Sequence, residues 1–423
     1  MIEEAKDLSR LRAGLHFGFT ILIKILAGLV VIKVLAWKLG PEGFGVLGQL
    51  MTLAAIVGML AGGGISNGLI KVLAKTPITE QEGRAWFGSA FTMVMIVSIA
   101  FAVLLSLFSG ALSDYFLPSV GAGLFIILAV SQIIIALGNL PLAEVSSRGD
   151  VRSYSRVNVL GTLLGAALVV AAACYGGLVG AAYAVLLMPA MIGVVALAYV
   201  VVWRRQLLSA CGYLFDLARI KHLMLFSLVT LVGALSVPLA QLFIRDVMAR
   251  AVGWDQVGLW QAVVKLSDVY MQFVGVVLLN FVLPRYSAAA DMQRVFKEWL
   301  GSLSALLVVL LIGFFVIFVL RQYIVKLVFS ADFLPMLQYL LPQMVGDTLR
   351  TVAASISYIY MSRGLLGVSV AFELMQGVLL ALAFSYFFGA SGGMAPVYAH
   401  VFTYAVLSVL MGLGLLIWMK RKA

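Results

Sequence analysis

The chain has 423 residues, of which 63% are hydrophobic and 11% charged, and its mean hydropathy is +1.10. A water-soluble domain of this length cannot bury so much apolar surface, so lipid must solvate most of the chain. The first twelve residues carry charges of both signs and lead into a full-length apolar run, so we expect no cleavable signal peptide. The two cysteines and three histidines are widely separated and predict neither a disulfide framework nor a metal site.

The sequence predicts twelve membrane-spanning helices, at 15–39, 46–73, 85–108, 122–143, 157–174, 178–203, 221–244, 258–283, 297–320, 336–361, 365–388 and 394–419. Of the 29 lysines and arginines, twenty fall on the side that holds the N-terminus, five on the other side and four inside spans. Because an excess of lysine and arginine marks the cytoplasmic side, we expect both termini in the cytoplasm. The net charge of +11 is then a consequence of topology, and we exclude a nucleic-acid partner.

The two halves of the chain repeat each other weakly. Three short motifs recur in the same order at offsets of 213, 217 and 215 residues: GPEGFG from 40 and GWDQVG from 253, SDYFLP from 113 and SADFLP from 330, SRG from 147 and 362. This order predicts a duplication of six helices.

The duplication predicts an all-α membrane protein with two six-helix lobes. We expect an N-terminal lobe at 1–203, a cytoplasmic linker at 204–220 and a C-terminal lobe at 221–423. Because six is even, both lobes enter from the same side, so a pseudo-two-fold axis should run along the membrane normal. In repeat-built transporters a central cleft between the lobes holds the ligand, and rocking of the lobes gives alternating access.

No catalytic signature is present. The chain has no GxxxxGK[ST] phosphate loop, no HExxH and no Cys/His cluster, so neither ATP hydrolysis nor a metal reaction is indicated. We expect a protein that is not an enzyme and has no cofactor. Coupling to protons, sodium or the membrane potential is left open.

Lysines inside the first span are the most informative feature, because a cation in hydrocarbon costs several kcal/mol. Lys24 lies about 12 Å of helix rise into the span, close to mid-bilayer, and we expect it to line the cleft. Lys33 lies near the exit end, where snorkelling toward the interface explains it equally well. The two lysines point to opposite sides of a straight helix unless it bends, for which Gly28 offers a place.

The eighth span carries a continuous polar face. Its members recur at helical spacing and must face protein or water: Gln261, Lys265, Asp268 and Gln272. Further polar residues within spans of the second half are Asn280, Gln343, Asp347, Arg350 and Glu373. Two pairs can simply neutralise themselves, Lys265 with Asp268 and Asp347 with Arg350. Glu373 can be protonated or paired with a lysine, and the three carboxylates are alternatively candidates for ion coupling or gating.

The second span contains three consecutive glycines at 62–64, followed by Asn67. Backbone groups freed by such a triplet are tolerated where they line a cavity. Close packing of helices is the alternative explanation.

Within the spans, four cations face three carboxylates, and all three carboxylates are in the second half. The first half contributes only positive charge, so the cleft predicts an anionic ligand. The candidate ligand-binding cations are Lys24, Lys33, Lys265 and Arg350; the candidate polar lining is Asn67, Gln261, Gln272, Asn280 and Gln343; the candidate coupling or gating residues are Asp268, Asp347 and Glu373.

Three runs resemble the Wzx-type flippases of lipid-linked oligosaccharides, which include lipid III flippases and O-antigen translocases: KILAGLVVIKVLAWKLGPEGFG from 24, AGGGISNGLIKVLAK from 61 and GLWQAVVKLSDVYMQF from 258. The resemblance implies the two-lobe architecture of the multidrug/oligosaccharidyl-lipid/polysaccharide exporter superfamily. It implies a substrate of undecaprenyl-diphosphate-linked glycan, moved from the cytoplasmic to the periplasmic leaflet of a bacterial inner membrane. A polysaccharide polymerase and a chain-length regulator are the protein partners to consider, for O-antigen or enterobacterial common antigen synthesis.

Three alternatives remain open. A cation or drug antiporter of the same superfamily predicts unpaired carboxylates in the first lobe, where this chain has lysines. A lipid II flippase predicts two further helices. A non-transporting scaffold of a polysaccharide assembly complex would tolerate neutral replacement of every buried charge.

Overall fold

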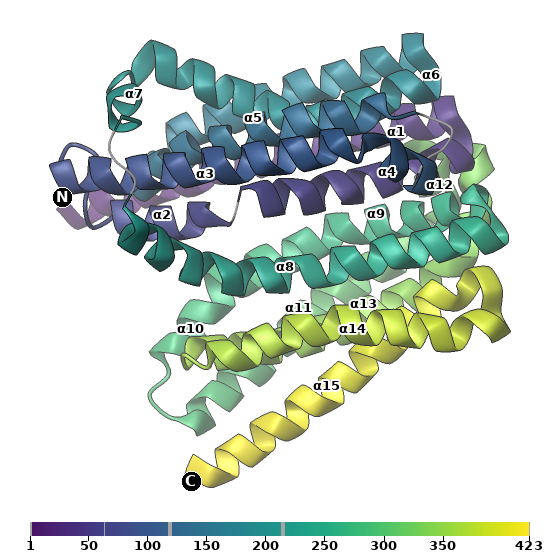
Figure 1. The fold of residues 1–423 in the computed structure, drawn as a ribbon. Coiled ribbons are helices and arrows are strands. Elements are labelled where there is room, and N and C mark those ends of the chain that lie inside the picture. Colours follow the sequence, from purple (N-terminus) through teal and green to yellow (C-terminus); the bar gives the residue numbers. More distant parts are fainter. Residues whose placement is uncertain (1, 63, 117–120, 213–215, 423) are drawn as a thin grey trace. The chain divides into compact units, whose positions relative to one another are not determined.

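A computed structural model describes residues 2–62, 64–116, 121–212 and 216–422 (Figure 1). Side chains of residues 2–17, 225–230, 232, 366 and 420–422 are outside the described part. The terminal cations counted for topology therefore lie outside it: Lys6, Arg10, Arg12, Lys420, Arg421 and Lys422. So do Gly63 of the glycine triplet, Pro118 of the second repeated motif, and residues 213–215 of the predicted linker.

The predicted all-α, multi-pass membrane fold is confirmed. No strand occurs among the described residues, and seven helices there are long and apolar enough to cross a bilayer. Three of these seven contain an interrupting glycine, at Gly40, Gly177 or Gly392, and each supplies two of the predicted spans. Helices α8 (Leu217–Val252) and α13 (Leu337–Ser362) supply the other two. Helical backbone satisfies its own hydrogen bonds, as lipid requires.

The chain forms two compact units. The first comprises Met1–Leu39 and Gln49–Leu231, and the second comprises Gly40–Gly48 and Val232–Ala423. Besides the beginning of α8, the first unit contains most of α1 (Ile2–Ala61) and all of α2 (Ile65–Leu73), α3 (Gln81–Leu107), α4 (Ser109–Phe116), α5 (Gly123–Ser147), α6 (Val151–Trp203) and α7 (Gln206–Ala210). The second contains the rest of α8 and α9 (Trp254–Val277), a π-helix (Leu278–Val282), α10 (Leu283–Ala288), α11 (Met292–Val319), α12 (Arg321–Val328), a 3-10 turn (Ala331–Met336), α13, α14 (Leu366–Ser391), a second 3-10 turn (Gly392–Met394) and α15 (Ala395–Lys422).

In the first unit, α6 folds back on itself at Gly177. This glycine has φ 56° and ψ −143°, a conformation that a side chain disfavours. A Cβ built at Gly161 would lie 2.4 Å from Ile192, and one at Gly165 would lie 2.7 Å from the carbonyl of Met188. The two halves of α6 therefore pack antiparallel with their backbones close together.

The second unit contains two comparable hairpins. Around Gly253 (φ 90°), Arg245 of α8 hydrogen-bonds to Gln261 of α9. Around Gly392 (φ 51°), Tyr404 of α15 hydrogen-bonds to Gln376 of α14. Gly253 and Gly392 stand 213 and 215 residues after Gly40 and Gly177, so the interrupted positions of the two halves correspond, as the repeat predicts.

The second span of each half is irregular at a corresponding depth in the chain. In the first half, α1 ends at Ala61 and α2 begins at Ile65 after Gly64 (φ 62°). In the second half, the π-helix Leu278–Val282 begins 214 residues after Gly64. Such interruptions free backbone groups and frequently mark functional sites.

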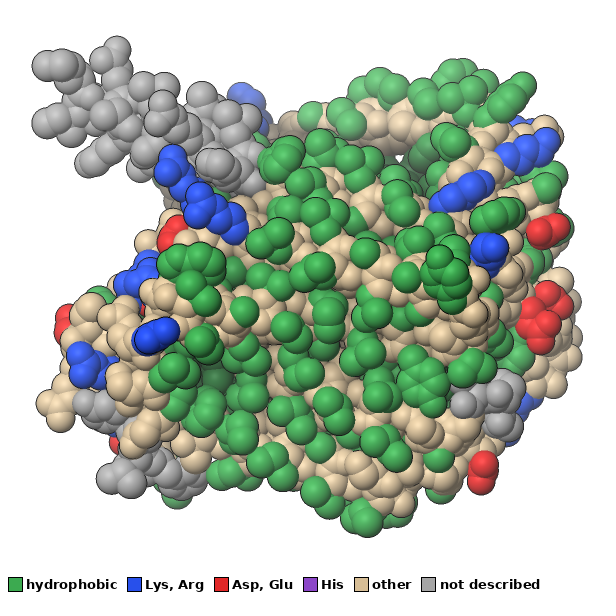
Figure 2. All heavy atoms as spheres, turned by 90° about the horizontal axis from the view of Figure 1, so that it is seen from above, with side chains coloured by type: hydrophobic (Ala, Val, Ile, Leu, Met, Phe, Trp, Pro, Cys, Tyr) green, Lys and Arg blue, Asp and Glu red, His purple; other side chains and the backbone are tan. Residues whose placement is uncertain are grey.

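Apolar side chains cover much of the surface. Figure 2 shows one face with hydrophobic side chains across its middle and charged side chains toward its two ends. Large apolar residues on α11 and α14 are more than half exposed, including Phe315 at 69% and Leu382 at 62%. In water these side chains would favour aggregation, whereas a lipid environment stabilises them.

Candidate functional site

The first unit contains a cavity of about 640 Å³ at the interruption between α1 and α2. Its wall is formed by both halves of α1, the start of α2, α5 and both halves of α6. The lining residues are Lys24, Met51, Ala54, Ala55, Gly58, Met59, Gly62, Gly64, Ser66, Ile135, Asn139, Thr162, Val185, Met188, Pro189 and Ile192. The two described members of the glycine triplet thus line a cavity.

Lys24 brings the positive charge into this cavity. Its Nζ donates a hydrogen bond to Oδ1 of Asn158 at 2.6 Å, and Nδ2 of Asn158 donates to the carbonyl of Tyr154 at 3.0 Å. Because its amide hydrogen is held by the backbone of its own helix, Asn158 presents its oxygen to the lysine. An amide oxygen carries no charge, so it orients the ammonium without neutralising it.

An ammonium group has three hydrogens, and Asn158 accepts one of them. Among the described residues, no carboxylate forms an ion pair with Lys24. The cavity can therefore accept an anion next to Lys24, where a low dielectric strengthens the attraction.

Other candidates of the first unit lie elsewhere. Lys33 is half-buried and is not part of the cavity wall, and Asn67 is exposed on α2. The sequence placed no carboxylate in the first six spans, but α5 extends to Ser147 and includes Glu144, which is 1% exposed. Glu144 is ion-paired with Arg148, one turn along the same helix.

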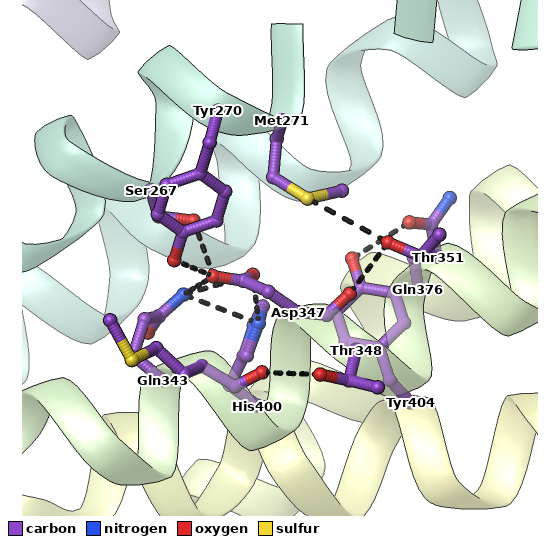
Figure 3. Close-up of polar contacts among 11 residues, drawn as sticks. Ser267, Tyr270, Met271, Gln343, Asp347, Thr348, Thr351, Gln376, His400 and Tyr404 are labelled. Carbon is purple, nitrogen blue, oxygen red and sulfur yellow. Dashed lines mark hydrogen bonds and ion pairs between the residues drawn. The ribbon is translucent and has the colours of Figure 1, made fainter. Parts of the chain in front are cut away.

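The second unit is organised around the buried carboxylate of Asp347 (Figure 3). Its Oδ2 accepts hydrogen bonds from the hydroxyls of Ser267 (2.6 Å) and Tyr270 (2.5 Å) on α9. Its Oδ1 lies 2.9 Å from Nε2 of His400 on α15, and Nε2 of Gln343 lies 3.3 Å away on α13. Donors from three helices thus converge on one carboxylate, as expected for its ionised form.

A second polar chain begins at Arg350. Its guanidinium carbon lies 5.7 Å from the ring centroid of Tyr404, so Tyr404 and not Asp347 provides its direct contact. The hydroxyl of Tyr404 donates to Gln376 at 2.8 Å, and Gln376 donates to the carboxylate of Glu373 at 2.7 Å. Arg350 is half-buried and the side chain of Glu373 is exposed, so this chain links a half-buried cation to an accessible carboxylate.

On α9, Lys265 and Asp268 form the ion pair that their spacing allows, at 3.1 Å, with exposed fractions of 31% and 47%. Gln261 is buried and accepts from Arg245 at 2.6 Å. Gln272 and Asn280 are exposed, and Asn280 donates to a carbonyl of its own helix. The predicted polar face therefore divides into a buried part and an accessible part.

A small cavity of about 30 Å³ connects these groups within the second unit. Asp268, Gln343, Arg350, His400 and Tyr404 are among the residues that line it. A volume of this size holds about one or two water molecules.

Sequence reasoning missed three residues of these sites. It did not single out Arg245, which it counted outside the spans, although the side chain is 1% exposed and hydrogen-bonds to Gln261. It considered His400 only as a metal ligand, although any titratable residue within a span is a candidate for function. It did not single out Asn158, whose only signal was a polar residue in an apolar run.

Comparison with known proteins identifies the family. A family model described as "Polysaccharide biosynthesis protein" matches residues 34–338, most of the chain. The chain belongs to the polysaccharide biosynthesis protein family. The chain is also similar to the lipid III flippases of Escherichia coli (strain K12) and Shigella flexneri. Each is 29% identical to it over 416 residues, and the alignment covers 98% of this chain and 100% of each relative. Both relatives are named as flippases, which are transporters and not enzymes.

The solved structures of two transporters have a similar fold. A multidrug resistance MATE family transporter in an inward-facing conformation has a TM-score of 0.76 at 17% identity, covering 97% of this chain and 100% of its own. The lipid II flippase MurJ, in an inward closed conformation, has a TM-score of 0.72 at 12% identity, covering 97% and 87%. The chain therefore shares its fold with a multidrug resistance transporter and with a lipid II flippase, so the fold alone does not define its substrate.

Proposed function

We propose that the protein is a flippase that moves an undecaprenyl-diphosphate-linked oligosaccharide from the cytoplasmic to the periplasmic leaflet of a bacterial inner membrane. The observation that carries the proposal is Lys24, a cation at a cavity inside an apolar bundle, oriented by the neutral amide of Asn158. Lys24 is half-buried, and a cation inside an apolar bundle without a carboxylate beside it is costly unless an anionic ligand occupies the site. The diphosphate of a lipid-linked glycan is such an anion.

The relatives support the same function. The lipid III flippases align along nearly the whole chain, and the family is one of polysaccharide biosynthesis. A lipid III or O-antigen repeat unit is accordingly the substrate that we favour. The protein partners that we propose are a polysaccharide polymerase and a chain-length regulator of the same pathway. We also propose that both termini lie in the cytoplasm.

We further propose that transport proceeds by alternating access between lobes at 1–203 and 221–423, joined by the linker 204–220. In this scheme Lys33, Lys265 and Arg350 add positive charge for the diphosphate. Sugars hydrogen-bond to polar side chains of the cleft, namely Asn67, Gln261, Gln272, Asn280 and Gln343. The carboxylates of Asp268, Asp347 and Glu373 couple transport to an ion or gate it.

Membrane potential favours the proposed direction. A headgroup with about two negative charges that moves outward from a cell-negative interior gains about 4–5 kcal/mol per 100 mV. Protonation of the ligand, or charged side chains that move with it, would reduce this gain.

The proposal is tested by reconstitution in liposomes with a fluorescent polyprenyl-diphosphate-linked oligosaccharide. We expect Lys24→Ala to abolish flipping and Lys24→Arg to retain part of it, since a guanidinium keeps the charge but not the geometry. Lys38→Ala is the matched control, because Lys38 lies on the same helix, exposed and against the ring of Trp37. Wild-type flipping by Lys24→Ala would remove Lys24 from the mechanism and with it the basis of the proposal.

An export of cationic drugs is the second candidate, favoured by the fold shared with the MATE transporter. It requires a carboxylate that is available to a cationic substrate in the first unit. Glu144 is the buried carboxylate that α5 adds there, and it is already paired with Arg148. The same liposomes loaded with a cationic dye would report this activity.

A further inference from the structure

The residues that line the cavity of the first unit suit the lipid end of the proposed substrate better than its glycan end. Of its sixteen lining residues, twelve are apolar or glycine. The polar ones are Lys24, Ser66, Asn139 and Thr162. Three methionines stand in the wall, at positions 51, 59 and 188, and methionine adapts its shape to irregular apolar ligands.

An oligosaccharide would be a poor ligand for such a wall. Each sugar carries several hydroxyl groups, and a buried hydroxyl without a partner costs free energy. Four polar side chains cannot provide hydrogen-bond partners for the hydroxyls of even two sugars, particularly as Lys24 already donates one hydrogen to Asn158. The glycan must therefore be bound elsewhere or remain in water.

A polyprenyl phosphate matches the same wall in both of its parts. The hydrocarbon contacts the apolar side chains, and the phosphate oxygens accept from the ammonium of Lys24. A cavity of about 640 Å³ lies within the range that encloses a drug-sized ligand, which suits a phosphate group and the first isoprene units and not a whole lipid.

We infer that this cavity binds the lipid end of the substrate: the phosphate next to the polyprenyl chain, together with the first isoprene units. This inference rests on the proposed function and deepens it, because it assigns one part of the substrate to one unit. The glycan lies outside the cavity, so the cavity recognises the carrier lipid and is indifferent to the identity of the sugar.

The structure offers a steric test at Gly58. This residue lines the cavity, and a Cβ added there meets no heavy atom within 4 Å, so a larger side chain would extend into the empty space. Gly313 on α11 is the matched control, since it is also helical, also has no heavy atom within 4 Å of an added Cβ, and does not line the cavity. We would compare Gly58→Leu with Gly313→Leu.

The experiment measures binding of a fluorescent short-chain polyprenyl diphosphate to the purified protein in nanodiscs of zwitterionic lipid. We expect Gly313→Leu to bind as the wild type does and Gly58→Leu to lose about tenfold in affinity, the equivalent of two buried methylene groups. Met59→Ser provides a second variant if Gly58→Leu does not fold, because Met59 is 38% exposed and the change only makes the wall more polar. It should weaken binding of the polyprenyl diphosphate while leaving inorganic diphosphate unaffected.

Competitors identify the chemical class of the ligand. Unlabelled polyprenyl diphosphate should displace the probe, and a free oligosaccharide at the same concentration should not. Displacement by the free oligosaccharide, or unchanged binding in Gly58→Leu and Met59→Ser, would overturn the inference. Equal displacement by phosphatidylglycerol would make this a general lipid-phosphate site and overturn its assignment to the carrier lipid.

Failure of this inference is distinguishable from failure of the proposed function. If Lys24→Ala stops flipping while Gly58→Leu binds and flips normally, the function stands and the cavity is not the lipid site. If the wild type binds polyprenyl diphosphate through Gly58 and Lys24 but flips no lipid-linked oligosaccharide, the cavity assignment stands and the function does not.

Discussion

Replacing Asp347 should destabilise the second unit more than any surface change. Asp347→Ala removes the acceptor of the hydroxyls of Ser267 and Tyr270 and of the amide of Gln343, at a position with no exposed surface. An unsatisfied buried donor costs about 1–3 kcal/mol. Removing one partner of a buried pair costs about 3–5 kcal/mol, which we take as the total because freed hydroxyls can rotate toward new partners.

This cost converts into a measurable shift in melting temperature. For a unit of this size, each kcal/mol corresponds to about 2–4 °C, so Asp347→Ala should melt about 6–20 °C below the wild type. Asp347→Asn should lose about half as much, because its amide oxygen still accepts while neutral hydrogen bonds are roughly half as strong as charged ones. The assay is fluorescence-monitored thermal unfolding in detergent micelles.

Ser304→Ala is the control for this series. Ser304 is exposed on α11 and bonds only to a carbonyl of its own helix, at Gly301. It should leave the melting temperature within about 2 °C of the wild type, as surface changes generally do. If Asp347→Ala behaves like Ser304→Ala, the carboxylate does not hold α9, α13 and α15 together and our reading of the cluster is incorrect.

Three further predictions concern single positions. Asp268→Asn should reduce flipping in liposomes. A reduction that occurs only with an imposed proton or sodium gradient would indicate ion coupling, and a reduction in all conditions would indicate a role in lobe closure. No effect in any liposome would refute both roles. Gly177→Ala should lower the melting temperature by the equivalent of about 1–3 kcal/mol, while Gly176→Ala, next to it at an ordinary φ, should not; equal effects would mean that the backbone conformation at Gly177 carries no constraint. Asp150 caps α6 through Ser153 N, and although partial burial alone would raise the pKa of its carboxyl, hydrogen bonds from Ser153 and the nearby Arg204 hold it below its usual value. Asp150→Ala should therefore cost about 0.5–1 kcal/mol at pH 7. The difference should shrink only as the pH falls below the ordinary aspartate pKa of 3.8, because protonation removes the same interaction from the wild type; a difference independent of pH would contradict this.

The course of the chain through the membrane could be predicted from the sequence because apolar length and glycine are local signals. The predicted spans end near Gly40 and Gly177, where the helices are in fact interrupted. The repeated motif that begins at Gly253 likewise falls between two predicted spans, and Gly253 separates α8 from α9. A helix in lipid depends on its own hydrogen bonds, so its limits are encoded where it lies.

The partners of the charged residues could not be predicted, because they depend on how helices face one another. Spacing along one helix predicted a pair of Asp347 and Arg350. In the structure α13 packs against α9 and α15, so the carboxylate of Asp347 hydrogen-bonds to Tyr270 and His400. Asn158 meets Lys24 across 134 residues of sequence. Only the arrangement in space brings such residues together, and one sequence taken alone does not encode it in any local pattern.

The central claim is that the ammonium of Lys24 holds the anionic end of a carrier lipid in the cavity of the first unit. Photo-crosslinking with a polyprenyl diphosphate that carries a diazirine on its first isoprene units tests it most directly. Mass spectrometry should find the label on peptides that contain residues 51–64 and 185–192, and Lys24→Ala should remove it. Label confined to peptides of the second unit, or unchanged labelling in Lys24→Ala, would contradict the claim.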